Sequence, residues 1–182
     1  MKKNFQGNTS GFTLIEVVVY AALMGIFSTV ILLNLMGAQT NSSVLERASA
    51  AIISDFRRAQ NLTIAGLNFQ GSSVCGYGIH YLSPDSYLLY AGGGSTCSSA
   101  NRNYQNGQDL DMQTIKITES NVKFKASFND IFFEPPDPKT YLNNNASLSG
   151  APIVITVGFE NQNCPTGCKT ITIFPSGKID FN

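Results

Sequence analysis

Charge and histidine are both scarce in this 182-residue sequence. Only 13% of the residues are charged, and 12 basic side chains balance 12 acidic ones, so the formal net charge at pH 7 is zero. A protein that binds nucleic acid regardless of sequence normally shows a basic excess, which is missing here. The one histidine, His80, excludes metal clusters built on several histidines and catalysis by two. The length corresponds to about one ordinary domain, which excludes a large multidomain enzyme.

Motifs for catalysis and cofactor binding are also missing. The glycines at 92–94 are not followed by the Lys-Ser/Thr of a phosphate-binding loop. Asp109 and Asp111 could be part of a calcium loop, but the glycine and the distal glutamate of an EF-hand are absent, so we favour a solvated loop. His80 lies in an expected strand, where a structural role is typical. We therefore expect no enzyme activity, no metal and no cofactor.

One long apolar run stands out against this background. Residues 12–36 hold 19 hydrophobic residues out of 25, and the 28 residues from Val17 to Val44 contain no ionisable group except Tyr20. A helix crosses a bilayer with about 20 apolar residues. Lys2 and Lys3 precede the run, so the positive-inside rule places the N-terminus in the cytoplasm and the rest of this single-pass chain outside. A cleaved secretory signal is the alternative, but its apolar region would be shorter, and residues 36–39 form a poor cleavage site.

Glu16 does not fit a plain membrane anchor. It lies at the start of the apolar run, where an unpaired carboxylate costs a few kcal/mol. The side chain could reach the membrane surface, or it could have a dedicated partner. Physical chemistry alone leaves both possibilities open.

The residues around Glu16 resemble a known signal. A short basic leader, then Gly11-Phe12-Thr13-Leu14-Ile15-Glu16, then an apolar helix, is similar to the N-terminal signal of type IV pilins and of type II secretion pseudopilins. The resemblance implies that a prepilin peptidase cuts between Gly11 and Phe12 and that Phe12 becomes N-methylated. It also implies that Glu16 pairs with the amine of Phe12 on a neighbouring subunit, which would fix the register between subunits.

Two further consequences follow from this resemblance. Loss of the leader removes Lys2 and Lys3, so the mature charge becomes 10 − 12 = −2. Many major pilins carry a proline where this chain has Leu33, and the nearest possible helix breaker is Gly37. The polar stretch at 37–43 either continues the helix or interrupts it as a flexible break.

Helical periodicity resumes after this stretch and predicts an amphipathic helix that ends near Gly66. Its apolar positions are Leu45, Ala48, Ile52, Phe56, Ala59 and Leu62. Residues 55–60, with the sequence Asp-Phe-Arg-Arg-Ala-Gln, are similar to the H-type minor pseudopilins of type II secretion and the related minor pilins of type IVa pili. The two arginines, Arg57 and Arg58, could contact lipid or nucleic acid, but we favour a solvated helix face.

Period-two alternation after residue 72 predicts about seven antiparallel strands. Strong candidates are residues 122–128, 153–159, 170–173 and 178–181, and weaker ones are 74–81, 87–91, 113–118 and 131–134. The expected fold is α+β, with a long N-terminal helix packed on a β domain in a pilin-like arrangement. We expect a leader at 1–11, a membrane or filament-core helix at 12–36, its amphipathic continuation at 37–66 and the β domain at 67–182. The loops at 92–109 and 135–150 are expected to be binding loops or mobile surfaces.

Four cysteines, Cys75, Cys97, Cys164 and Cys168, lie in the part expected outside the membrane. An even number there favours disulfides. Cys164 and Cys168 could close a small hairpin loop, which leaves Cys75 with Cys97, one of three possible connectivities. A four-thiolate zinc site is the rival, although only one pair approaches its spacing. A redox C-x-x-C motif does not fit, since three residues separate the cysteines.

These features predict a minor pilin or pseudopilin that primes or caps a filament. Its expected partners are other pilin-like subunits, the prepilin peptidase and methylase, and an assembly platform in the inner membrane. A DNA-binding minor pilin is an alternative, although Lys169, Lys178 and an isolated Arg102 offer few basic groups. A signal-anchored binding domain unrelated to filaments is another. The sequence leaves the secretion, adhesion, motility and competence systems undistinguished.

Overall fold

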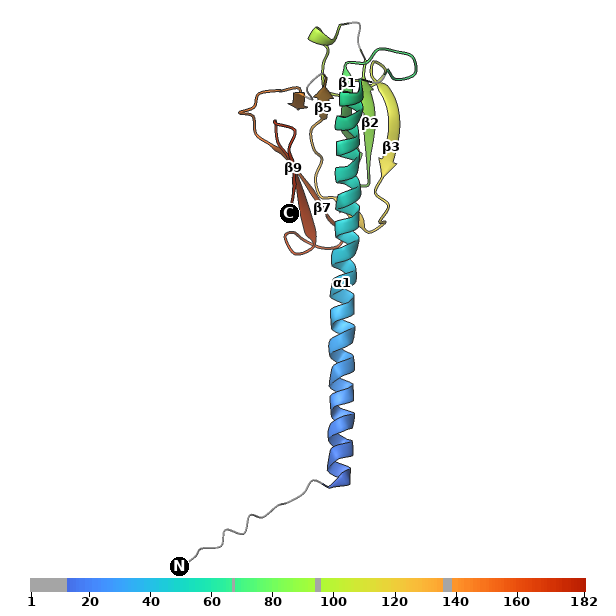
Figure 1. Cartoon of the computed structure of the whole chain (residues 1–182), viewed down its shortest axis with the longest axis vertical. Helices are drawn as coiled ribbons and strands as arrows, with labels where there is room; N and C mark the ends of the chain where they lie inside the picture. The colour runs from blue at the N-terminus through green and yellow to red at the C-terminus, as the bar shows by residue number, and fades with distance from the viewer. Residues whose placement is uncertain (1–12, 67, 94–95, 136–138) are drawn as a thin grey trace, which may run out of the picture. The chain divides into compact units, whose positions relative to one another are not determined.

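The computed structural model describes residues 13–66, 68–93, 96–135 and 139–182 (Figure 1). The chain divides into two compact units, Met1–Ser42 and Ser43–Asn182. Helix α1, Leu14–Ala65, continues without interruption through the polar stretch at 37–43. Of the two possibilities that the sequence left open there, the structure shows helix.

The part of α1 within the second unit is amphipathic, as the sequence predicted. Leu45, Ala48, Ile52, Phe56 and Ala59 are all buried, with 0 to 5% of their surface exposed. The helix ends at Ala65, and Gly66 follows with φ of 62°, the left-handed conformation that glycine adopts at low cost. Its N–H donates to the carbonyl oxygen of Thr63, which satisfies one of the last carbonyls of the helix.

Two antiparallel sheets complete the second unit. The first has the strand order β3-β2-β1-β5-β6, with β1 at Gly76–Ser83, β2 at Ser86–Gly92, β3 at Leu110–Lys116, β5 at Ile131–Glu134 and β6 at Lys139–Leu142. The second has the order β4-β7-β8-β9, with β4 at Val122–Phe124, β7 at Ile153–Phe159, β8 at Cys168–Ile173 and β9 at Ile179–Phe181. A short 3-10 helix, η1, spans Cys97–Ser99. The expected α+β, pilin-like arrangement is confirmed.

The structure departs from the predicted strands and loops most clearly at two places. The strand predicted at 122–128 ends at Phe124, because the chain turns and brings the ring of Phe128 edge-on to Phe124, with centroids 5.2 Å apart. Strand β6, Lys139–Leu142, lies inside the segment that we expected to be a loop at 135–150. This strand has only four residues, and it lies between a proline-rich and an asparagine-rich segment. Alternation of apolar and polar side chains is therefore too short there to be recognised in the sequence.

The five-stranded sheet is covered on both faces. Its inner face, with Tyr77, Ile79 and Leu89, belongs to one core with α1 and the second sheet. Its outer face carries a smaller cluster of Cys75, Leu88, Tyr90 and Phe132, on which Cys97, Ala100 and Tyr104 of the following loop pack. The loop at 92–109 is therefore in part the cover of a second core. This explains why every residue of β2 is buried.

Glycine makes the outer cluster possible. Gly78 pairs with Tyr90 across the β1–β2 ladder, and a Cβ on residue 78 would lie 2.4 Å from Cζ of the Tyr90 ring. Gly76 and Gly92 lie under Phe132 in the same way, with Cβ distances of 2.9 and 2.7 Å to its ring. The two aromatic rings therefore fill the space that side chains would otherwise occupy.

Candidate functional site

The first unit contains a helical segment suited to a membrane or a helix bundle. The segment Leu14–Leu32 spans 19 residues and has a mean hydropathy of 2.2. None of its most apolar stretch is buried. At 1.5 Å per residue the segment is about 28 Å long, close to the thickness of a bilayer core. Large side chains such as Leu14 and Met24 are 83% and 71% exposed, and an apolar surface of this extent is typical of a segment that contacts lipid or a partner.

Glu16 lies in the first turn of this helix and is half-buried. Its backbone N–H and that of Val17 donate to the carbonyl oxygen of Thr13, at 3.0 and 3.2 Å. A carboxylate there interacts favourably with the positive end of the helix dipole. Gly11 and Phe12, the expected cleavage and methylation positions, lie outside the described residues.

The six residues at 55–60 attach α1 to both sheets. Tyr87 of β2 donates its hydroxyl hydrogen to Oδ2 of Asp55 at 2.5 Å, and Arg58 Nη1 donates to Oε1 of Gln113 in β3 at 2.9 Å. Gln60 Nε2 donates to the carbonyl oxygen of Gly177 in the β8–β9 turn, at 2.8 Å. Phe56 and Ala59 are fully buried between these contacts. Residues 55–60 therefore hold the helix against the two sheets. Arg57 and Arg58 are exposed, which agrees with the predicted solvated face of the helix.

Both disulfides support loops of the second unit. Cys75 is joined to Cys97 and Cys164 to Cys168, which is the connectivity that the spacing favoured. With all four sulfurs in disulfides, the four-thiolate zinc site is not formed. Lys125 Nζ donates to the carbonyl oxygens of Phe159 and Gln162, so its ammonium group holds the second disulfide's loop from the β4 side.

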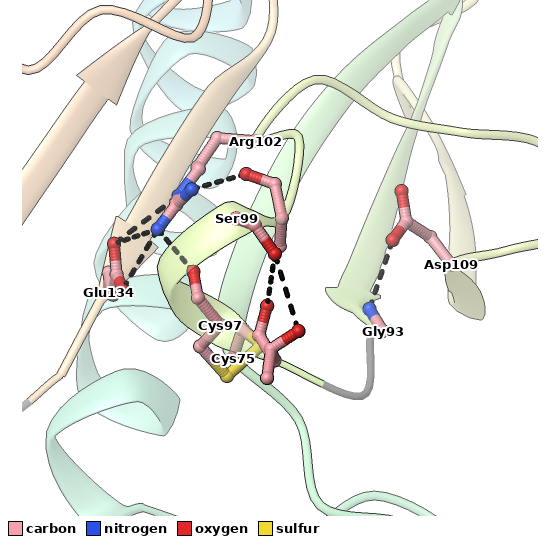
Figure 2. Close-up of a disulfide and its surroundings, with 9 residues drawn as sticks. Cys75, Gly93, Cys97, Ser99, Arg102, Asp109 and Glu134 are labelled. Atoms are coloured by element: carbon pink, nitrogen blue, oxygen red, sulfur yellow. Dashed lines mark hydrogen bonds and ion pairs between the residues drawn. A yellow bond between two sulfur atoms is a disulfide. The ribbon is translucent and has the colours of Figure 1, made fainter.

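Arg102 is the central contact of the loop after the first disulfide (Figure 2). Its guanidinium group donates to the carbonyl oxygens of Cys97 and Ala100 and pairs with Glu134 of β5, with Nη2 to Oε2 at 3.1 Å. The two side chains are only 11% and 18% exposed. Arg102 is therefore not isolated, as its place in the sequence had suggested: its planar guanidinium satisfies both a carboxylate and backbone carbonyls here.

Asp130 holds the same loop from another side. Its Oδ2 accepts the backbone N–H of Tyr104 at 2.7 Å, and its Oδ1 lies 2.6 Å from Nδ1 of His80. The His80 imidazole packs on the Tyr104 ring, with centroids 4.6 Å apart. His80 thus has the structural role expected of it, in a contact between β1 and a loop that sequence did not reveal.

Asp109 closes the base of the loop, and the expectation that it is solvated was wrong. It is 9% exposed, and its two oxygens accept the backbone N–H groups of Gly93 at 3.0 Å (Figure 2) and Gln105 at 2.6 Å. Burial raises the pKa of the Asp109 carboxyl; these two hydrogen bonds oppose the rise, and the carboxylates of Asp130 and Asp111 add to it.

The sequence did not reveal Glu134 and Asp130 as the partners of Arg102 and His80. Glu134 is 32 residues from Arg102, and Asp130 is 50 residues from His80. The sequence held one weak signal for these partners. Asp130 and Glu134 directly flank the apolar run 131–133, in a sequence that has few charged residues. For the described residues, no group of three or more histidine, cysteine or acidic side chains could hold a metal ion.

Comparisons with known proteins bear on the N-terminal unit. Residues 7–32 match the family model of the prokaryotic N-terminal methylation motif, which includes Gly11, Phe12 and Glu16. No curated protein and no solved structure gave a significant match to the chain. The motif implies processing by a prepilin peptidase and assembly with other pilin subunits, and with the apolar helix it indicates membrane anchoring. The chain therefore carries the prepilin signature of type IV pilin-like proteins.

Proposed function

We propose that this chain is a minor pilin or pseudopilin, a structural subunit without enzyme activity that primes or caps assembly of a type IV pilus or a type II secretion pseudopilus. One observation carries the proposal. A prepilin signature at 7–32 coincides with the apolar segment Leu14–Leu32, whose large side chains are exposed. Lipid would cover this helix before assembly, and helices of other subunits would cover it afterwards.

The prepilin signature implies the order of events. The basic leader stays in the cytoplasm, prepilin peptidase cuts between Gly11 and Phe12, and the new amine of Phe12 is methylated. The second unit lies outside the inner membrane, where both disulfides are stable. An assembly platform in that membrane then moves the helix into the filament.

Glu16 is the residue on which subunit pairing depends in this proposal. A carboxylate and an ammonium group are each costly in an apolar bundle and stabilise one another only as a pair. Glu16 would meet the amine of Phe12 on a neighbouring subunit, so that the helices adopt one register. Leu33 in place of a proline and the 55–60 pattern support the minor, H-type assignment over a major pilin.

Glu16→Ala tests this role, with Glu46→Ala as the matched control because Glu46 is an exposed glutamate of the same helix. We expect normal cleavage in both variants and at least about tenfold less Glu16→Ala protein in sheared filaments, since an unpaired buried charge costs several kcal/mol. Equal amounts of wild-type and Glu16→Ala protein in filaments would contradict the pairing.

The three basic residues considered for DNA binding each have a contact within the chain. Arg102 is paired with Glu134, Lys178 Nζ lies 2.7 Å from Asp180, and Lys169 lies over the Phe181 ring. A salt-dependent gel shift with the full chain remains the direct measurement of that activity.

A further inference from the structure

A polar cavity of about 290 Å³ lies beside the first disulfide's loop. The end of β2, the residues around η1 and the turn before β3 form its walls. The polar side chains that line it are the hydroxyls of Thr96 and Ser99, the amides of Asn101, Gln105 and Gln108, and the carboxyl of Asp109. Its volume is at the low end of the ~300–1,000 Å³ typical of small-molecule sites, so a ligand would be about one ring in size.

The lining groups retain capacity for new hydrogen bonds. The Thr96 and Ser99 hydroxyls are 3.3 Å apart, and Ser99 donates to the Thr96 carbonyl oxygen at 3.4 Å, both longer than the ~2.7–2.8 Å of a good hydroxyl bond (Figure 2). Each Asp109 oxygen accepts one hydrogen bond from a backbone N–H, and a carboxylate has about four acceptor positions. A ligand whose hydroxyl groups both donate and accept could form the remaining hydrogen bonds with these side chains.

Charge argues against ionic ligands. The described lining holds one carboxyl group, that of Asp109, and no basic side chain, so an anion would find no positively charged partner there. A divalent cation needs about six or more oxygen ligands, whereas the described lining includes one carboxyl already engaged with two backbone N–H groups. Ala100 supplies the only apolar side chain of the described lining, which leaves an apolar ligand without contacts.

The described wall of the cavity is preorganised. The Cys75–Cys97 disulfide ties η1 to the start of β1, and Arg102 fixes the carbonyl oxygens of Cys97 and Ala100 while pairing with Glu134 (Figure 2). A site that is already ordered loses less conformational entropy when it binds. Weak individual hydrogen bonds can therefore add up to measurable affinity.

We propose that this cavity binds a neutral, hydroxyl-rich ring, that is, one sugar unit of a glycan. Hydroxyl and amide side chains of this kind match the alternating donors and acceptors of a sugar, and the negative surroundings reject phosphates and nucleic acids. The proposal goes beyond filament assembly and would give the subunit a glycan-binding surface.

The test uses the full chain in lipid nanodiscs, since sugar-based detergents would compete. Methyl glycosides of glucose, galactose, mannose and N-acetylglucosamine serve as probes in saturation-transfer NMR and calorimetry. We expect at least one of them to bind, and the double variant Thr96→Val/Ser99→Ala to weaken that binding about tenfold through the loss of two hydroxyls. Thr114→Val, on exposed β3 and outside the cavity, is the matched control and should bind as wild type does.

Three results would overturn the proposal: no signal from any glycoside, equal binding by the double variant and wild type, or preferential binding of inorganic phosphate at the same residues. Thiol titration confirms that each variant keeps both disulfides, and its urea midpoint compared with wild type shows whether it is folded. Glycan binding and filament incorporation are measured separately, so failure here leaves the role of Glu16 untouched.

Discussion

Leu14, Ile15 and Met24 in the first unit expose 83%, 72% and 71% of their surface, whereas Ile52, Phe56 and Ile79 in the second expose 2%, 0% and 0%. Both sets are large apolar side chains, so the difference lies in where their covering comes from. The second unit covers its own apolar surface with two sheets and a loop. The first unit depends on lipid or on other helices, because exposed apolar surface of this extent is unstable in water.

Carboxylates differ between the two units in the same way. In the second unit, Glu134 forms an ion pair with Arg102, and Asp55 accepts a hydrogen bond from the hydroxyl of Tyr87. Glu16 has no side-chain partner among the residues that the structure describes. The second unit therefore provides partners for these two carboxylates when it folds, and Glu16 of the first unit is expected to find its partner on assembly.

The largest effect is expected from Gly78→Ala in the second unit. A Cβ at this position would lie 2.4 Å from Cζ of the Tyr90 ring, and overpacking of a core costs up to about 3 kcal/mol. Urea unfolding of the full chain, followed by tyrosine fluorescence, should show a midpoint lowered accordingly. Gly25→Ala is the control in the first unit, where nothing lies within 4 Å of the added Cβ. Equal urea midpoints for the two variants would show that the Tyr90 ring does not pack closely on Gly78.

Arg102→Ala should have the next largest effect. It leaves Glu134 without its partner in a mostly buried position and releases the carbonyl oxygens of Cys97 and Ala100, at a cost of about 2 kcal/mol. Hydrogen exchange of the amides at 97–105 should accelerate. Arg57→Ala, which removes an exposed arginine, should change stability by no more than about 0.5 kcal/mol. Unchanged exchange at 97–105 would show that other contacts hold the loop.

Tyr87→Phe should destabilise the second unit by about 1 kcal/mol, because Asp55 loses a hydrogen bond without loss of ring packing. Tyr20→Phe removes a hydroxyl from the exposed first unit and should leave unfolding unchanged. The two unfolding curves, measured side by side, show whether hydroxyl contacts matter in the second unit alone. A larger loss for Tyr20→Phe would reverse the comparison.

The smallest effect concerns pH. Burial raises the pKa of Asp109 in the folded chain above the ordinary 3.8, so the folded state binds the proton more tightly than the unfolded state does. This contribution to stability is present below pH 3.8 and is lost as the pH rises through the higher folded value. Stability of wild type relative to Asp109→Asn should therefore fall over that range. A constant difference between the two proteins would show that the carboxyl titrates as it does in the unfolded chain.

Linear patterns made much of the molecule predictable from sequence. The strands at 131–134 and 153–159 were predicted to the residue. The first contains a continuous apolar run, and the second has an apolar side chain at every second position. The buried face of the helix followed from spacings of three and four residues. The prepilin signature was recognised in the same way, since its residues are contiguous.

Contacts between distant residues were not predictable. Arg102 looked isolated because its partner Glu134 lies on a strand 32 residues away. The loop at 92–109 was expected to be a binding loop or a mobile surface, because its polar composition hides the few side chains, Cys97, Ala100 and Tyr104, that cover the outer core. Asp109 looked solvated for a similar reason, since backbone N–H groups are its partners and leave no trace in a sequence.

Processing of the leader is measured by intact-mass and N-terminal analysis of the chain produced with a prepilin peptidase. We expect a protein that begins at a methylated Phe12 and lacks residues 1–11. A protein that keeps its leader, or that begins after the apolar segment, would contradict it.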